Sequence, residues 1–155
     1  MRREIPGALA VVILSTGCGE CVTSEYGGFQ EVLADKVMER GWIPPFLPRS
    51  ASEIEMQNDL DGNDFSLRFR LPPSEVEGFV SILEENGFAQ QDGGPAPVPV
   101  CGPWKRNHTP DMDGAMVFSG RHVMGPPGRR SIWQRGATVD VVIEPATGYV
   151  HYASR

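Results

Sequence analysis

Hydrophobic side chains recur at helical spacing in two segments of the chain, residues 28–40 and 74–86. Within each segment the apolar residues are three or four positions apart, which places them on one side of an α-helix. They are Phe29, Val32, Leu33 and Val37 in the first segment and Val76, Phe79, Val80 and Leu83 in the second. Gly41 and Gly87 follow, and glycine commonly ends a helix. We therefore predict two amphipathic helices.

Alternation of apolar and polar side chains predicts strands. Residues 65–71 alternate strictly, which is typical of a half-buried strand with one solvated face. The turn residues 61–64 join this strand to the loosely alternating residues 53–60, and the two form a predicted hairpin. Further strand segments are 115–123, 132–133, 138–143 and 149–153. Mixed hairpins and helices predict an α+β fold, an antiparallel sheet of four to six strands with two helices packed on one face.

The first residues have the pattern of a secretory signal peptide. Two arginines stand near the start, an apolar run fills most of residues 5–14, and small residues precede Cys18. This run is too short for a bilayer-spanning helix, which needs about 20 residues. A buried strand is the alternative interpretation of the same run. The predicted organisation is a signal peptide at 1–17, an N-terminal tether at 18–27 and a single α+β domain at 28–155.

Cys18 follows Gly17 in an arrangement that resembles the lipobox of bacterial lipoproteins. In that family such a cysteine is diacylated and becomes the mature N-terminus. The family usually carries Leu three residues before the cysteine, whereas this chain has Ser15 there. The resemblance implies an exported protein with a lipid at Cys18, anchored on the periplasmic or outer-surface face of a bacterial membrane.

The chain has three cysteines, Cys18, Cys21 and Cys101. If Cys18 takes a lipid, the other two can form a disulfide in an oxidising compartment. Closing a loop of roughly 80 residues is worth about 4 kcal/mol in the chain-entropy model. Two alternatives stay open. Cys18 and Cys21 form a Cys-x-x-Cys pair, although no βαβ unit follows, and the three cysteines with His108 have the ligand types of a zinc site but lack a second close pair.

Charge is distributed unevenly along an acidic chain with a formal net charge of −6. An acidic balance disfavours nucleic acid as a partner. Basic residues concentrate in 101–135, which would suit anionic lipid headgroups or glycan phosphates. More commonly such a segment faces solvent or the acidic remainder of the chain. The possible ligand surface consists of Trp104, Lys105, Arg106, Arg129, Arg130 and Trp133.

The sequence contains no recognisable catalytic or metal-binding motif. Gly-x-Ser-x-Gly and a phosphate-binding glycine loop are both missing. Residues 59–70 begin like an EF-hand calcium loop, but Asp64 stands where glycine is required and Arg70 stands where glutamate is required. No metal-ligand spacing relates the three histidines, which are His108, His122 and His151. We therefore predict no catalytic residue, metal or cofactor.

Two further segments carry a resemblance to a bacterial family. Residues 41–54 read Gly-Trp-Ile-Pro-Pro-Phe-Leu-Pro-Arg-Ser-Ala-Ser-Glu-Ile, and residues 143–152 read Ile-Glu-Pro-Ala-Thr-Gly-Tyr-Val-His-Tyr. Both are similar to segments of small uncharacterised bacterial exported proteins and lipoproteins. The resemblance implies an envelope location and an α+β fold, and it brings no catalytic residue with it.

Three hypotheses for function follow. The first is a bacterial cell-envelope lipoprotein that acts as a non-catalytic binding or structural module, held at the membrane by its N-terminal lipid, with an unknown protein or envelope glycan as partner. The second is an envelope hydrolase that joins His108 or His122 to a serine or aspartate across residues 91–135. The third is a small inhibitor or immunity-type protein that offers an acidic face to a basic partner.

Overall fold

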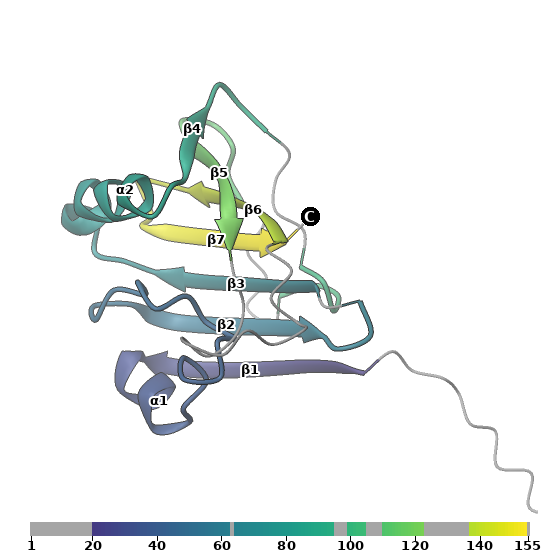
Figure 1. Ribbon diagram of the computed structural model, residues 1–155. Coiled ribbons are helices and arrows are strands. Elements are labelled where there is room, and N and C mark those ends of the chain that lie inside the picture. The colour runs from purple at the N-terminus through teal and green to yellow at the C-terminus, as the bar shows by residue number, and fades with distance from the viewer. Residues whose placement is uncertain (1–19, 63, 95–98, 105–109, 123–136, 155) are drawn as a thin grey trace, which may run out of the picture.

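A single antiparallel sheet of seven strands forms the centre of the computed structural model, counted over the residues that the structure describes (Figure 1). Those residues are 20–62, 64–94, 99–104, 110–122 and 137–154. The strands are β1 (Cys21–Gly28), β2 (Ser52–Asp59), β3 (Asp64–Arg70), β4 (Ala89–Gln91), β5 (Met116–His122), β6 (Ala137–Ile143) and β7 (Tyr149–Ser154). Their order across the sheet is β1-β2-β3-β7-β6-β5-β4, so β7 lies in the middle.

The predicted sheet of four to six strands is therefore wrong, and the strands that were missed are the two at the edges. β1 buries only Tyr26, and every residue of β4 is exposed. Neither strand shows the alternation of apolar and polar side chains by which a strand is recognised in sequence. β1 pairs with β2 and β4 pairs with β5. Most of the predicted tether at 18–27 belongs to β1.

The prediction of two packed amphipathic helices is also corrected. α1 (Phe29–Ala34) stops well before residue 40, because Lys36 has a φ of 57°, which no right-handed helix accommodates. α2 (Val76–Glu85) is the one long helix in the described part of the chain, and it follows a short 3-10 turn, η1 (Pro73–Glu75). Gly87, at a φ of 83°, ends the α2 segment as predicted.

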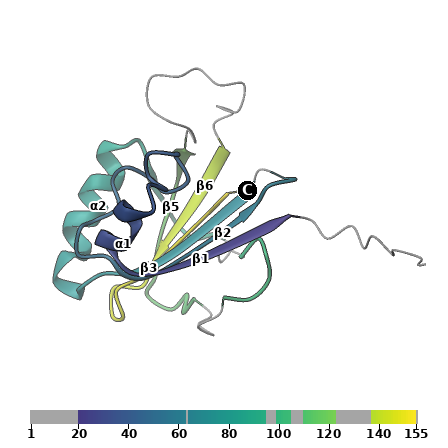
Figure 2. The same cartoon turned by 90° about the horizontal axis from the view of Figure 1, so that it is seen from below.

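The main hydrophobic core lies between the sheet and the helices, which occupy the same side of it (Figure 2). β3 contributes Phe65, Leu67 and Phe69, the apolar residues of its alternating pattern. α2 contributes the predicted residues Val76, Phe79 and Leu83. The rings of Phe69 and Phe79 meet edge to face, with their centroids 5.6 Å apart. The apolar half of the β3 pattern thus correctly marks this core.

The opposite side of β3 is buried as well, so the predicted solvated face is wrong. Ser66 and Arg68 point to this side and have no exposed surface. Residues 99–104 cross over them. The backbone N–H of Val100 donates to Ser66 Oγ at 3.2 Å, and the guanidinium carbon of Arg68 lies 5.3 Å from the ring centroid of Trp104. β3 is therefore a strand with two buried sides.

Some predicted features lie outside the described residues. The signal peptide at 1–17, Cys18 and the strand segment at 132–133 are among them. Of the helices that the structure does describe, none is both long and apolar enough to cross a membrane.

Candidate functional site

A group of buried polar side chains occupies the side of the sheet that faces away from the helices. Glu55 pairs in register with Arg68, and Arg68 pairs with His151, so β2, β3 and β7 bring these three together. We call the group the polar cluster; it consists of Glu55, Gln57, Ser66, Arg68, Glu144 and His151. Burying such groups is costly unless each is hydrogen-bonded or paired, so their contacts decide what the cluster can do.

Arg68 is the largest fully buried side chain in the described part of the chain. Its Nη2 atom lies 3.1 Å from Glu55 Oε2, and both side chains are shielded from solvent. The guanidinium carbon is also 5.3 Å from the ring centroid of Trp104 and 5.7 Å from that of Tyr149. Aromatic faces attract a cation. One carboxylate and two rings thus replace much of the hydration that Arg68 loses.

Glu144 and His151 form the second close side-chain contact of the polar cluster. His151 Nε2 lies 2.9 Å from Glu144 Oε1, and the Thr147 hydroxyl donates to Glu144 Oε2 at 3.0 Å. Both carboxylate oxygens of Glu144 therefore have partners within the protein. Because His151 is fully buried, it fits a structural role better than proton transfer to an external substrate.

Tyr149, Glu53 and Arg70 lie together at the end of the sheet, next to the polar cluster. The Tyr149 hydroxyl donates to Glu53 Oε2 at 2.8 Å, and Arg70 Nη1 donates to Glu53 Oε1 at 3.2 Å. Burial raises the pKa of Tyr149, and the hydrogen bond to the Glu53 carboxylate raises it further. Glu53 has a φ of 51°, which costs a non-glycine residue about 1–2 kcal/mol. These two hydrogen bonds help to offset that strain.

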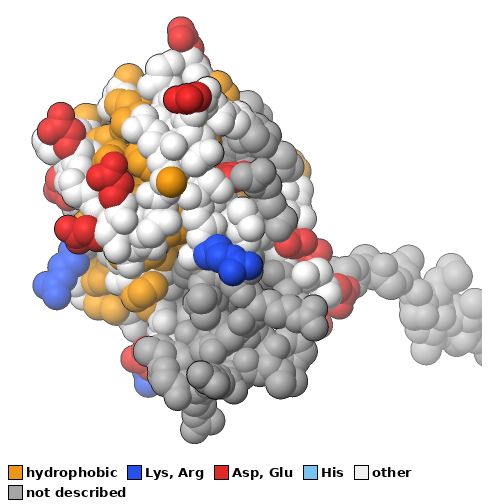
Figure 3. Space-filling model, turned by 45° about the horizontal axis from the view of Figure 1, so that its top comes forward, with side chains coloured by type: hydrophobic (Ala, Val, Ile, Leu, Met, Phe, Trp, Pro, Cys, Tyr) orange, Lys and Arg blue, Asp and Glu red, His pale blue; other side chains and the backbone are white. Residues whose placement is uncertain are grey.

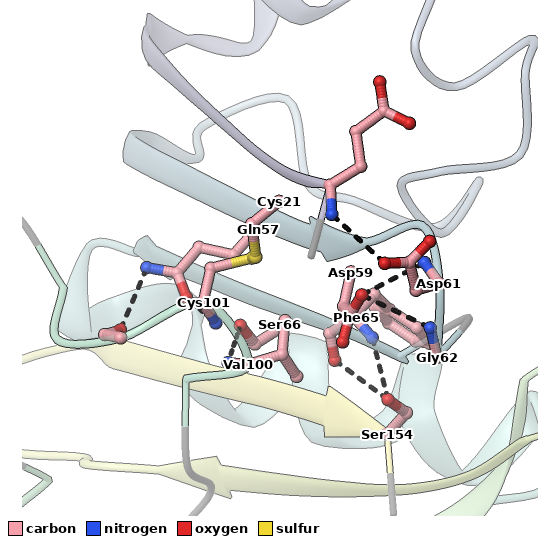
Figure 4. The surroundings of a disulfide bond; sticks show 12 residues. Cys21, Gln57, Asp59, Asp61, Gly62, Phe65, Ser66, Val100, Cys101 and Ser154 are labelled. Carbon is pink, nitrogen blue, oxygen red and sulfur yellow. Dashed lines mark hydrogen bonds between the residues drawn. A yellow bond between two sulfur atoms is a disulfide. The ribbon is translucent and has the colours of Figure 1, made fainter. Parts of the chain in front are cut away.

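A disulfide joins Cys21, at the start of β1, to Cys101 in the crossing segment (Figure 4). This confirms the predicted pairing and leaves neither cysteine available for a redox-active Cys-x-x-Cys or for zinc. Gln57 holds the same segment with both ends of its amide. Its Nε2 donates to the Gly102 carbonyl at 3.3 Å, and its Oε1 accepts from the Cys101 N–H at 3.0 Å. Residues 99–104 are thereby fixed over the sheet.

Of the predicted ligand surface, only Trp104 lies in the described residues. Its side chain packs against Arg68 and is 6% exposed, so it belongs to the interior. His122 lies in β5, but its side chain is not among those described. The other predicted residues outside the described ranges are Lys105, Arg106, His108, Arg129, Arg130 and Trp133.

Sequence reasoning missed the polar cluster. Alternation assigns Arg68 to the solvated face of its strand and says nothing about a cover on that face. The one available signal was the predicted disulfide. A bond from Cys21 to Cys101 carries the neighbouring Trp104 toward the start of β1, and a large apolar side chain placed there must pack against the sheet.

Two surface hollows adjoin the sheet. The smaller, of about 170 Å³, is lined by Asp111, Asp113, Gly114, Glu144, Pro145, Ala146 and Thr147. The larger, of about 530 Å³, is lined by Asn86, Gly87, Gln91, Ser119, Gly120, Arg121 and Thr138. Across the described ranges, no three His, Cys, Asp or Glu side chains are grouped so as to hold a metal ion. This part of the chain offers a rigid scaffold with surface hollows.

Comparison with known proteins gives one match. Residues 20–70 match the family model of the YbbD head domain, which suggests a small bacterial protein. The match spans β1, α1, β2 and β3, so it includes Glu55 and Arg68 but ends before Glu144 and His151. No curated protein and no solved structure is significantly similar to the chain.

Proposed function

We propose that this protein is a bacterial cell-envelope lipoprotein that is anchored through a lipid on Cys18 and acts as a non-catalytic binding or structural module. The observation that carries the proposal is the Cys21–Cys101 disulfide. Disulfides persist in oxidising compartments such as the bacterial periplasm and the cell surface. With these two cysteines paired, Cys18 is the remaining one, and the lipobox resemblance assigns the lipid to that residue.

The start of β1 is compatible with an anchor at Cys18. β1 begins at Cys21, and the three residue steps from Cys18 span at most about 11 Å. A lipid there would hold the start of β1 near the membrane surface. Tyr149 and the smaller hollow lie at the opposite end of the sheet.

The contacts of the polar cluster support a non-catalytic role. Arg68 is paired with Glu55, and Glu144 is bonded to His151 and Thr147. Groups that are buried and already hydrogen-bonded to one another hold a fold in place. Binding modules depend on such rigid support for their surfaces.

Fatty-acid labelling tests the anchor. The full chain, expressed in bacteria that are fed an alkyne-bearing fatty acid, should acquire the label and lose the mass of residues 1–17. Cys18→Ser should abolish the label and release the protein from the membrane fraction. Cys101→Ser is the matched control, because it removes the disulfide but should keep the label.

Two results would contradict the anchor. One is a mature wild-type protein that retains residues 1–17 and has no acyl mass. The other is a Cys18→Ser variant that is labelled as strongly as the wild type.

A further inference from the structure

We propose that the larger surface hollow binds a carbohydrate that carries one anionic group. This inference rests on the binding role proposed above and names its site and ligand class. We call the site the β5 hollow; its lining residues are Asn86, Gly87, Gln91, Ser119, Gly120, Arg121 and Thr138. Its volume of about 530 Å³ lies within the range of small-molecule sites, about 300–1,000 Å³.

Strand register places the polar side chains of the hollow on one side of the sheet. Ala89 of β4 pairs with Ser119 of β5, and Gln91, two residues further, shares that side. Arg121 is two residues beyond Ser119 and pairs with Thr138 of β6. Four hydrogen-bonding side chains from three adjacent strands thus project together, on the side of the sheet away from the helices.

Two glycines leave backbone uncovered in the β5 hollow. A Cβ atom on Gly120 would lie 2.6 Å from the ring of Phe88, so the core below excludes a side chain there. Gly87 has a φ of 83°, which favours glycine, and a Cβ there would meet nothing within 4 Å. In the described residues, the pairing of β4 with β5 ends at Ser119, so residues 120–122 have no strand neighbour on that edge.

The chemistry of the lining favours a sugar over a peptide. Its described residues supply amides, hydroxyls and one guanidinium, with no carboxylate and no large apolar side chain. Peptides gain most of their affinity by burying apolar or aromatic anchors in fitted pockets. A sugar ring instead presents hydroxyl groups, each of which both donates and accepts hydrogen bonds. Thr138 can both donate and accept, whereas the amide nitrogens of Asn86 and Gln91 already donate to backbone carbonyls, so these two residues offer their amide oxygens as acceptors.

Arg121 sets the charge preference. It is exposed, and no ion pair between described residues includes it. A guanidinium binds carboxylate or phosphate through paired hydrogen bonds. Asn86 stands at the C-terminal end of α2, where the helix dipole is negative, and acidic side chains are also scattered over the described part of the face in Figure 3. The helix end disfavours a ligand with several negative charges, whereas the Arg121 guanidinium favours one anion beside it.

Titration by NMR tests the site on the full chain with its disulfide intact. The probes are glucuronic acid, glucose as its neutral analogue, and inorganic phosphate as an anion without a sugar. Glucuronic acid should shift the amide signals of residues 119–121 and bind at least about fivefold more tightly than glucose. Arg121→Gln should remove this difference, whereas Arg49→Gln, an exposed arginine before β2, should preserve it.

Several outcomes would overturn the inference. Equal shifts with phosphate alone would mean an adventitious ion only. Equal affinity for glucuronic acid and glucose would remove the role of Arg121, and so would a preference unchanged in Arg121→Gln. Stronger shifts with triglycine would reassign the hollow to strand addition by a peptide. Acylation of Cys18 plays no part in this experiment, so the proposed lipid anchor and the proposed carbohydrate site can be refuted independently.

Discussion

Nη2 of Arg68 lies 3.1 Å from Oε2 of Glu55, across neighbouring strands and out of contact with solvent. Each charge has lost its hydration, so each depends on the other. Removing one partner leaves the other charge buried and unpaired. Replacing both with apolar residues of similar size leaves no buried charge at all.

Arg68→Met should therefore lower the free energy of unfolding by about 3–5 kcal/mol, because Glu55 keeps a buried charge without its partner. The double variant Glu55→Leu with Arg68→Met should regain much of this loss. Urea unfolding of the two single variants and the double variant measures the coupling.

The matched control is Arg70→Met, which breaks a partly exposed pair with Glu53 at 3.2 Å. Such pairs contribute at most about 1 kcal/mol. If Arg68→Met were as mild as Arg70→Met, the buried pair would not have the structural role assigned to it.

Gly148→Ala should destabilise the protein far more than Gly87→Ala. Both glycines have positive φ, 76° and 83°, so alanine pays a backbone cost of about 1–2 kcal/mol at either position. At Gly148 the new Cβ would also lie 2.0 Å from the carbonyl oxygen of Leu71, whereas at Gly87 it would meet nothing within 4 Å. Thermal unfolding of the two variants separates the clash from the backbone cost, and equal losses would contradict the close approach.

Removing the disulfide should loosen the crossing segment. Cys21→Ser with Cys101→Ser should cost about 4 kcal/mol in the chain-entropy model. The backbone N–H groups of Val100 and Cys101, which donate to Ser66 and Gln57, should exchange with solvent faster. Hydrogen exchange measured by NMR checks this, with Cys18→Ser as the control that keeps the bond. Unchanged exchange would mean that Ser66 and Gln57 hold the segment alone.

Alkaline pH should weaken the fold. Burial raises the pKa of Tyr26, Tyr149 and Tyr152 above the unfolded value of about 10. As pH rises past 10, the unfolded chain releases these protons before the folded protein does. Stability is then complete below about pH 10 and falls above it.

Tyr149→Phe should reduce that fall, because one of the three tyrosines no longer titrates. The comparison is the urea midpoint of wild type and variant at pH 8 and at pH 11. A decrease of the same size in both proteins would show that Tyr149 keeps an ordinary pKa.

Sequence patterns predicted the elements that carry apolar residues at regular spacing or on either side of a clear turn. The apolar stripe of α2 and the β3 residues of the main core follow from periodicity, and the β6–β7 hairpin follows from two apolar segments joined by a turn that contains Gly148. The disulfide followed from assigning Cys18 to the lipid, which left Cys21 and Cys101 as a pair.

The remaining features depend on contacts between distant residues. β1 and β4 are edge strands with few buried side chains, so their own residues carry little pattern. Arg68 is buried because Trp104, far along the chain, covers it. Glu144 and His151 meet across a turn that positions them, and nothing in their local sequence indicates burial.

The central position of β7 has a consequence for how the sheet assembles. β7 is the only described strand that joins β1–β3 to β4–β6, so without it the sheet separates into two three-stranded halves. The segment that matches the YbbD head domain is one of these halves. Pairing of β7 with β3 on one side and β6 on the other is thus what links the two halves within the described sheet. A chain cut in the turn at 144–148 would leave a vacant inner edge on each half, and a separate peptide of residues 149–154 would complete both.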